Sequence, residues 1–380
     1  MTLRLLIVDD SAVYRQALKA IVEGISGVQC IGVACDGKEA LEKISSDKPD
    51  VVTLDMEMPV MSGMDVIKAV IERKLKSRLI IVSACSQSGA EATIKALNLG
   101  AYDFITKPNR LGGNGAKDEL CRQLIEKLSI LGCGFKRPLT KTVQSTESSH
   151  LSREGNQAAK PSMLARSDSA HIATLSPVLL PKAIVMGSST GGPKALLKLF
   201  SGLQSKLDMP VFIVQHMPPM FTQTLAKSID EISLVSVKEA EDGEKPLPNH
   251  AYIAPGGRQM KLIKGSTGVE IKITDDEPNN FCKPSVDYFF SSVADIYESR
   301  VLGIILSGMG EDGSAGLRRM KQHGIKVLGQ DEESCVVYGM PRVAQELGLV
   351  DEQVSIDNMA STIESVLQSS RKNAEVRIRH

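Results

Sequence analysis

The chain has 380 residues and carries 45 acidic and 45 basic side chains, so its formal net charge is zero. This balance, with an aromatic content of 4% and no tryptophan, argues against a general nucleic-acid binder or a stacking platform for single strands. Seven scattered cysteines form no C-x-x-C pair, and the N-terminus reaches two aspartates too early for a secretory signal. No apolar run approaches a membrane span, so we expect a cytoplasmic protein. The odd number and wide spacing of the cysteines predict reduced thiols in that compartment.

Residues 1–131 alternate short apolar runs with helical periodicity. The runs are LRLLIV, VQCIGVA, VVTL, RLIIVSA and YDFIT. Helical patterns such as YRQALKAIVEGI and KEALEKIS lie between them. Five successive strand–helix units predict an α/β domain with a flavodoxin-like, doubly wound parallel sheet.

The composition changes after this first domain. Residues 132–180 are rich in Ser, Thr, Pro and charged side chains, which predicts a flexible linker. A second α/β domain is expected over 181–370, followed by a tail at 371–380. Its strands KAIVMG, VFIVQH, VLGIILSG and IKVLGQ alternate with helical patterns, which predicts another doubly wound parallel sheet. The stretch 251–274 predicts a small antiparallel hairpin.

Charged and polar side chains stand at the ends of the first domain's strands. Asp9 and Asp10 follow the first strand, Asp55 ends the third, Ser83 the fourth and Lys107 the fifth. The carboxyl ends of parallel strands meet at one edge of a sheet, so these residues should form one site. Three carboxylates suit Mg²⁺, and Asp55 could act as a nucleophile that forms an aspartyl phosphate. Taken alone, the aspartate pair could equally be a helix N-cap.

The motifs VDD, LDMEMPVMSG, VSA and GAYDFITKP, in this order, resemble those of response-regulator receiver domains. The resemblance covers the whole first domain. It implies phosphorylation at Asp55, with Mg²⁺ bound by Asp10, Asp55 and the backbone carbonyl of Glu57 and with Asp9 close by. The residues that it implies for the phosphorylation switch are Ser83, Phe104 and Lys107.

In the second domain, a strand runs into the sequence GSSTGG. This turn lacks the spacing of phosphate-binding loops. It matches the G-x-S-x-G nucleophile turn through Gly187, Ser189 and Gly191. Small neighbours would expose the serine Oγ there, and the N–H of Thr190 could face an oxyanion. By itself, the motif also fits a glycine-rich packing turn.

A serine nucleophile needs a base, and the base needs an acid that orients it. His216 ends VFIVQH, the strand directly after the serine's helix, and a βαβ unit brings two such strand ends together. Asp312 stands at the turn after VLGIIL, with Glu311 beside it as the competing acid. Strand-end geometry favours neither acid.

The two domains and the linker together resemble the chemotaxis protein-glutamate methylesterases, the CheB family. The second-domain motifs that carry the resemblance are GSSTGG, QHMPPMFT, YIAPGGRQM, KPSVDYFF, SGMGEDGSAGL and VYGMPRVAQELGLV. The resemblance implies Ser189 as nucleophile, His216 as base, and Asp312 rather than Glu311 as the orienting acid. Ser188 stands where alanine is common in the family and could be mistaken for the nucleophile. The oxyanion-hole candidates are the backbone N–H groups of Thr190 and Met309.

The same resemblance implies a phosphorylation-activated hydrolase that removes methyl esters from chemoreceptor glutamates and deamidates particular receptor glutamines, giving sensory adaptation. A histidine kinase of the chemosensory array would donate the phosphoryl group, and the ester step would need no cofactor. We expect a monomer that binds no nucleic acid and meets the membrane only through receptors. We also expect the unphosphorylated receiver to pack against the Ser189 edge. Two alternatives stay open, namely a phospho-regulated binding module and a hydrolase of small-molecule esters or amides.

Overall fold

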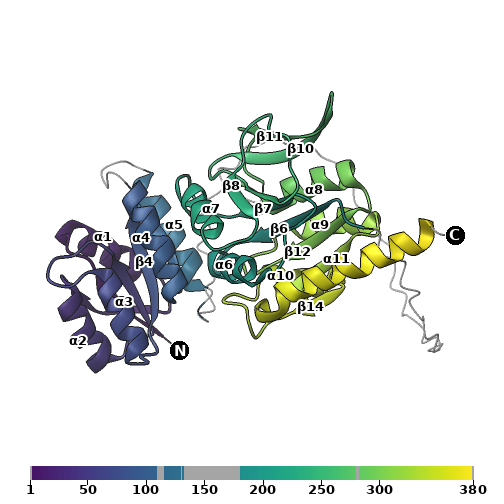
Figure 1. The fold of residues 1–380 in the computed structure, drawn as a ribbon. Helices are drawn as coiled ribbons and strands as arrows, with labels where there is room; N and C mark the ends of the chain where they lie inside the picture. The colour runs from purple at the N-terminus through teal and green to yellow at the C-terminus, as the bar shows by residue number, and fades with distance from the viewer. Residues whose placement is uncertain (1, 109–114, 130, 132–179, 280–281, 379–380) are drawn as a thin grey trace, which may run out of the picture.

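Two parallel sheets, each covered by helices, lie side by side along the molecule (Figure 1). The computed structural model describes residues 2–108, 115–129, 131, 180–279 and 282–378, with side chains as far as residue 373. Apart from Leu180, the expected linker lies outside the described residues. Within the described part of the chain, no helix is long and apolar enough to cross a bilayer.

The N-terminal domain has five parallel strands in the order β2-β1-β3-β4-β5, which confirms the predicted flavodoxin-like fold. The strands are β1 (Leu3–Val8), β2 (Val28–Ala34), β3 (Val51–Asp55), β4 (Arg78–Ala84) and β5 (Asp103–Lys107). The helices are α1 (Ala12–Glu23), α2 (Gly37–Asp47), α3 (Gly63–Glu72), α4 (Gln87–Leu99) and α5 (Ala116–Ser129). Helices α2, α3 and α4 pack on one face and α1 and α5 on the other, so the apolar strands are buried from both sides.

The C-terminal domain contains a seven-stranded parallel sheet in the order β14-β13-β12-β6-β7-β9-β8. The strands are β6 (Ala183–Ser188), β7 (Val211–Gln215), β8 (Ser236–Glu239), β9 (His250–Ile253), β12 (Val301–Ile305), β13 (Lys326–Gln330) and β14 (Glu352–Val354). The helices are α6 (Gly192–Gly202), α7 (Phe221–Asp230), α8 (Val286–Tyr297), α9 (Ser314–Gln322), α10 (Met340–Glu346) and α11 (Ile356–Ile378). This sheet confirms the predicted second α/β domain.

Two boundaries differ from the sequence-based expectation. Within 251–274, only β10 (Gln259–Gly265) and β11 (Gly268–Thr274) form the antiparallel hairpin, whereas β9 joins the main sheet. Burial explains this difference, because Ala251, Tyr252 and Ile253 are fully enclosed. Helix α11 continues past residue 370 into the expected tail, where RKNAEVRI contains several strong helix formers.

The strand order places the ends of β6, β7 and β12 next to one another. Ser188 at the end of β6 pairs with Gln215 of β7, and Gly187 pairs with Ile305 of β12. The chain adds strands on one side of β6 first and then crosses to the other side, so the gap between β6 and β12 is a topological switch point. Ligands bind at such points in open α/β sheets.

Candidate active site

The turn after β6 is tightly enclosed around the predicted nucleophile. Gly191 has φ +80°, and a Cβ there would lie 2.5 Å from Val336 and 2.7 Å from the Ser307 hydroxyl. Both the backbone conformation and the space therefore require glycine. Pro193 lies in the first turn of α6, where its missing N–H leaves no helical hydrogen bond unmade.

Gln215 holds this turn through hydrogen bonds and leaves the two serine hydroxyls in different environments. The Ser188 hydroxyl donates to Gln215 Oε1 at 2.7 Å, and Gln215 Nε2 donates to the Ser189 carbonyl at 2.9 Å. Ser188 is completely buried, whereas Ser189 is 6% exposed and its Oγ makes no hydrogen bond within the described residues. Sequence reasoning missed Gln215, although a polar residue in the otherwise apolar run VFIVQ was a signal.

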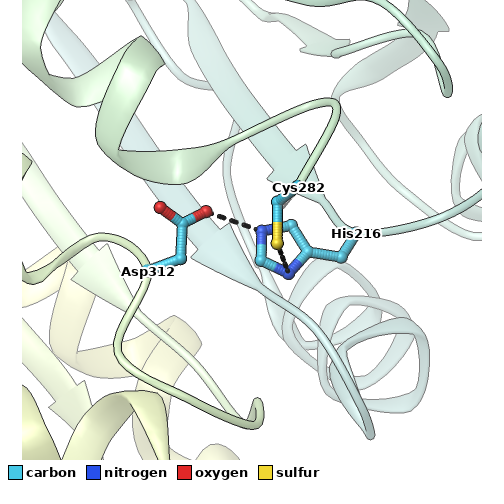
Figure 2. A group of neighbouring side chains, drawn as sticks. All are labelled: His216, Cys282 and Asp312. Carbon is cyan, nitrogen blue, oxygen red and sulfur yellow. Dashed lines mark hydrogen bonds and ion pairs between the residues drawn. The ribbon is translucent and has the colours of Figure 1, made fainter. Parts of the chain in front are cut away.

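The structure brings His216 and Asp312 together, with His216 Nε2 2.8 Å from Asp312 Oδ2 (Figure 2). Three donors at the start of α8 hold this carboxylate. They are the Ser285 hydroxyl at 3.0 Å and the N–H groups of Val286 at 2.7 Å and Asp287 at 3.0 Å. Because an ionised carboxylate only accepts, Nε2 must carry a proton and the lone pair of a neutral ring lies on Nδ1.

His216 and Asp312 each shift the pKa of the other. Burial alone would lower the pKa of His216, but the hydrogen bond to Asp312 and the nearby Cys282 outweigh burial and raise it. Burial alone would raise the pKa of Asp312, yet the hydrogen bond and charge of His216 lower it to about 2. Behind this pair, burial raises the pKa of Asp287 to about 6. The carboxylate of Asp312 thus stabilises the imidazolium form of His216.

Ser189 and His216 follow the paired ends of neighbouring strands, as predicted. The His216 N–H donates to the Ser188 carbonyl at 3.1 Å, which ties the two strand ends together. Within the described residues, no hydrogen bond joins Ser189 Oγ to the imidazole. In the absence of substrate, such catalytic hydrogen bonds are often long and tighten when substrate binds.

The oxyanion-hole candidates flank Ser189. Gly308 lies against the serine so closely that a Cβ at this position would be 2.9 Å from Ser189 Cβ. Met309 follows Gly308, and Thr190 follows the serine. In the described part of the chain, neither Thr190 N–H nor Met309 N–H donates a hydrogen bond, so both remain available to a ligand. Glu311, the competing acid, is exposed, and among the described residues the carboxylate that pairs with the His216 ring is that of Asp312.

The N-terminal domain contacts the nucleophile turn directly. The Thr190 hydroxyl donates to Asp103 Oδ2 of β5 at 2.7 Å. Lys127 of α5 lies 2.9 Å from the same oxygen and 3.1 Å from Thr190 Oγ1. Burial would lower the pKa of Lys127, but Asp103 outweighs it and raises this pKa. The residue after Ser189 is therefore held by a buried ion pair of the other domain.

Apolar contacts extend this interface. The Phe104 ring stacks on Phe221 of α7, with centroids 4.7 Å apart and ring planes 15° apart. Helix α4 packs against α6 and α7 (Figure 1). Gln87 Nε2 is 3.5 Å from Thr224 Oγ1 on α7. One buried apolar cluster accordingly runs from the α4 face of the N-terminal sheet into the C-terminal domain.

The predicted acidic cluster forms at the carboxyl edge of the N-terminal sheet. Carboxylate oxygens of Asp9, Asp10 and Asp55 lie within 4.8 Å of one another. Lys107 Nζ is 2.8 Å from Asp9 Oδ2 and 2.7 Å from Asp55 Oδ2. Burial raises the pKa of Asp9, whereas the two carboxylates overcome burial and raise the pKa of Lys107.

A cavity of about 200 Å³ opens beside these carboxylates. Its lining includes Asp10, Asp55, Glu57, Ser83 and Lys107. The Ser83 hydroxyl donates to the Gly89 carbonyl at 3.0 Å. The oxygen-rich walls fit a hard cation, and the nearby hydroxyl and ammonium fit the oxygens of a phosphoryl group.

The two sites define a class of protein in which a receiver-like domain docks on a domain with a Ser-His-Asp constellation. Residues 184–363 match the family model described as CheB methylesterase, and residues 5–112 match the response regulator receiver domain. The protein-glutamate methylesterase/protein-glutamine glutaminase of Desulfotalea psychrophila is 41% identical over 366 residues, covering 95% of this chain and 97% of the relative. The Bacillus subtilis protein of the same name is 38% identical over 373 residues, covering 97% and 99%.

Among solved structures, the Thermotoga maritima CheB methylesterase catalytic domain is 38% identical, with a TM-score of 0.47, and the match covers 50% of this chain and 98% of that one. The identity to full-length relatives over nearly the whole chain decides the assignment. The chain belongs to the CheB methylesterase family, with a response-regulator receiver at its N-terminus.

Proposed function

We propose that this protein is a phosphorylation-activated hydrolase of chemoreceptors in the cytoplasm. It would remove methyl esters from receptor glutamates and deamidate particular receptor glutamines, as the names of its relatives describe. The observation that carries the proposal is the contact of His216 with Asp312 next to the Ser189 turn. A binding module without chemistry would not need a carboxylate that stabilises a histidinium beside a nucleophile turn.

In the proposed reaction, Ser189 Oγ attacks the side-chain carbonyl of the receptor residue. His216 accepts the serine proton at Nδ1, because Nε2 is engaged by Asp312. The free N–H groups of Thr190 and Met309 would stabilise the oxyanion. The histidinium then protonates the leaving methoxide oxygen or amide nitrogen, which departs as methanol or ammonia and leaves an acyl-serine. The same ring deprotonates a water that attacks this ester, which releases glutamate and restores Ser189. Each turnover replaces a neutral receptor side chain with a carboxylate.

Phosphorylation is assigned to Asp55 of the receiver domain. The carboxylates of Asp10 and Asp55 and the backbone carbonyl of Glu57 would hold Mg²⁺, with Asp9 close by. Bound Mg²⁺ would neutralise charge on the incoming phosphoryl group. Lys107, already 2.7 Å from Asp55, would pair with a phosphoryl oxygen.

The docked receiver supplies the regulation in this proposal. Asp103 and Lys127 contact Thr190, and Phe104 stacks on Phe221. In the proposal, these contacts would keep a large receptor substrate away from Ser189. Phosphorylation would draw the Ser83 hydroxyl away from the Gly89 carbonyl and towards the new phosphoryl group. The resulting shift of Phe104 would weaken its stacking and favour the undocked form.

The test is methanol release from receptor membranes that carry labelled methyl groups. The wild-type protein should release labelled methanol, and Ser189→Ala should not. A small-molecule esterase would hydrolyse model esters and leave the receptors methylated. A binding module would release nothing from either substrate.

A further inference from the structure

Cys282 lies directly against the catalytic histidine and has no part in the proposed esterase reaction. Its Sγ is 3.7 Å from His216 Nδ1, while Asp312 contacts the other ring nitrogen at 2.8 Å. Figure 2 shows the thiol and the carboxylate at the two different nitrogens of one ring. Ligand atoms of all three residues lie within 4.8 Å of one another.

The distance between Sγ and Nδ1 is close to that between two ligands of one tetrahedral zinc ion. Zinc lies about 2.3 Å from a cysteine sulfur and about 2.0–2.1 Å from a histidine nitrogen, which places these ligand atoms about 3.5 Å apart. The observed 3.7 Å needs only a small adjustment. The lone pair of Nδ1 is on the side of the thiol, because Nε2 donates its proton to Asp312.

Asp312 completes the arrangement as the partner of the metal-binding imidazole. Histidine ligands of metals commonly donate their second ring N–H to a carboxylate, which fixes the tautomer and makes the ring a stronger ligand. Asp312 is in turn held by the three donors at the start of α8. The ring orientation that suits His216 as a base therefore also suits it as a metal ligand.

We propose that Cys282 Sγ and His216 Nδ1 bind a thiophilic divalent cation, Zn²⁺ above all, which inhibits the esterase. On binding, the Cys282 thiol loses its proton to solvent, and the metal takes the Nδ1 lone pair that would accept the Ser189 proton. Water completes the coordination. The inhibitory part rests on the proposed function, whereas the metal site does not.

The choice of metal follows from the ligand chemistry. Thiolate and imidazole favour zinc and its soft neighbours, whereas Mg²⁺ prefers oxygen ligands. The receiver presents such an oxygen site in Asp9, Asp10 and Asp55. Excess Mg²⁺ should therefore fill the receiver without displacing zinc from Cys282 and His216.

The binding test uses the full-length protein with Co²⁺ as a spectroscopic substitute for zinc, in excess Mg²⁺. We expect a thiolate-to-cobalt charge-transfer band that saturates at one equivalent and disappears when Zn²⁺ is added. Cys282→Ser and Cys282→Ala should both lose the band. Cys35→Ser is the matched control, because Cys35 belongs to another group of potential ligands with Asp36 and Glu39, and this variant should keep the band. Absence of the band in wild type, or its persistence in either Cys282 variant, would overturn the metal site.

The inhibition test measures methanol release in buffers of fixed free Zn²⁺, relative to the metal-free rate of each variant. The half-inhibitory Zn²⁺ concentration should rise about tenfold or more in Cys282→Ser. Even the loss of a residue that only hydrogen-bonds to a metal ligand lowers metal affinity by about 10- to 100-fold. A chelator should restore the wild-type rate. Equal inhibition of Cys282→Ser and wild type would overturn the inhibitory role. If wild type releases no methanol even without zinc, the proposed function fails, and the cobalt band still decides the metal site.

Discussion

Replacing Lys127 with methionine should release the receiver from the esterase site. The Lys127 side chain is 14% exposed, and its ammonium lies 2.9 Å from Asp103 Oδ2. Removing one member of a buried ion pair costs about 3–5 kcal/mol while the other charge stays buried. Allosteric coupling between two sites is typically worth about 1–3 kcal/mol. The cost of leaving Asp103 buried without Lys127 exceeds the coupling energy. The domains should therefore separate and return Asp103 to water.

The assay is methanol release from methylated receptor membranes by the unphosphorylated protein. The rate of Lys127→Met should rise about 5- to 150-fold, the factor that corresponds to the coupling energy. A phosphodonor should then add little. Lys117→Met is the matched control, because Lys117 is exposed on the same helix, and it should keep the low rate. If Lys127→Met unfolds at the wild-type temperature and is no faster than wild type, the contacts of Asp103 and Lys127 with Thr190 do not hold the domains together.

Three further outcomes are expected. A phosphodonor with Mg²⁺ should label wild type. Undiminished labelling of Asp55→Asn would mean that another carboxylate is the phosphorylated residue. Ser189→Ala should lose several orders of magnitude in rate because triad members act as a unit, whereas Ser188→Ala should retain much of its activity; the reverse order would mean that the turn is misassigned. Removing residues 1 to about 140 should raise the rate above that of the unphosphorylated parent and abolish stimulation by a phosphodonor. A fragment that is no faster would exclude simple occlusion.

The positions of Ser189 and His216 could be predicted because strand ends follow a general rule. Apolar runs bounded by turn signals locate β6 and β7, and a βαβ connection places their carboxyl ends on one edge. The same rule assembled the acidic cluster of the receiver. It could not choose between Asp312 and Glu311, because both residues follow β12. That choice depends on hydrogen bonds from the distant helix α8.

Helix α8 itself was not predicted, although its first residues fall within the motif KPSVDYFF. Its buried residues Val286, Phe289, Phe290 and Val293 have the spacing of one helix face, so the sequence did contain a signal for this helix. The Phe104–Phe221 stacking, by contrast, was inaccessible to sequence reasoning. Local periodicity shows which residues are buried but not which surface of another domain buries them.

The most direct test of the central claim compares methanol release from methylated receptor membranes with and without a phosphodonor, using the full-length protein and Mg²⁺. If esterase chemistry at Ser189 is controlled through Asp55, the phosphodonor should raise the initial rate about 5- to 150-fold. The rate of Asp55→Asn should stay at the unstimulated level. No methanol in either state would contradict the esterase assignment. Equal release in both states would contradict control by the receiver.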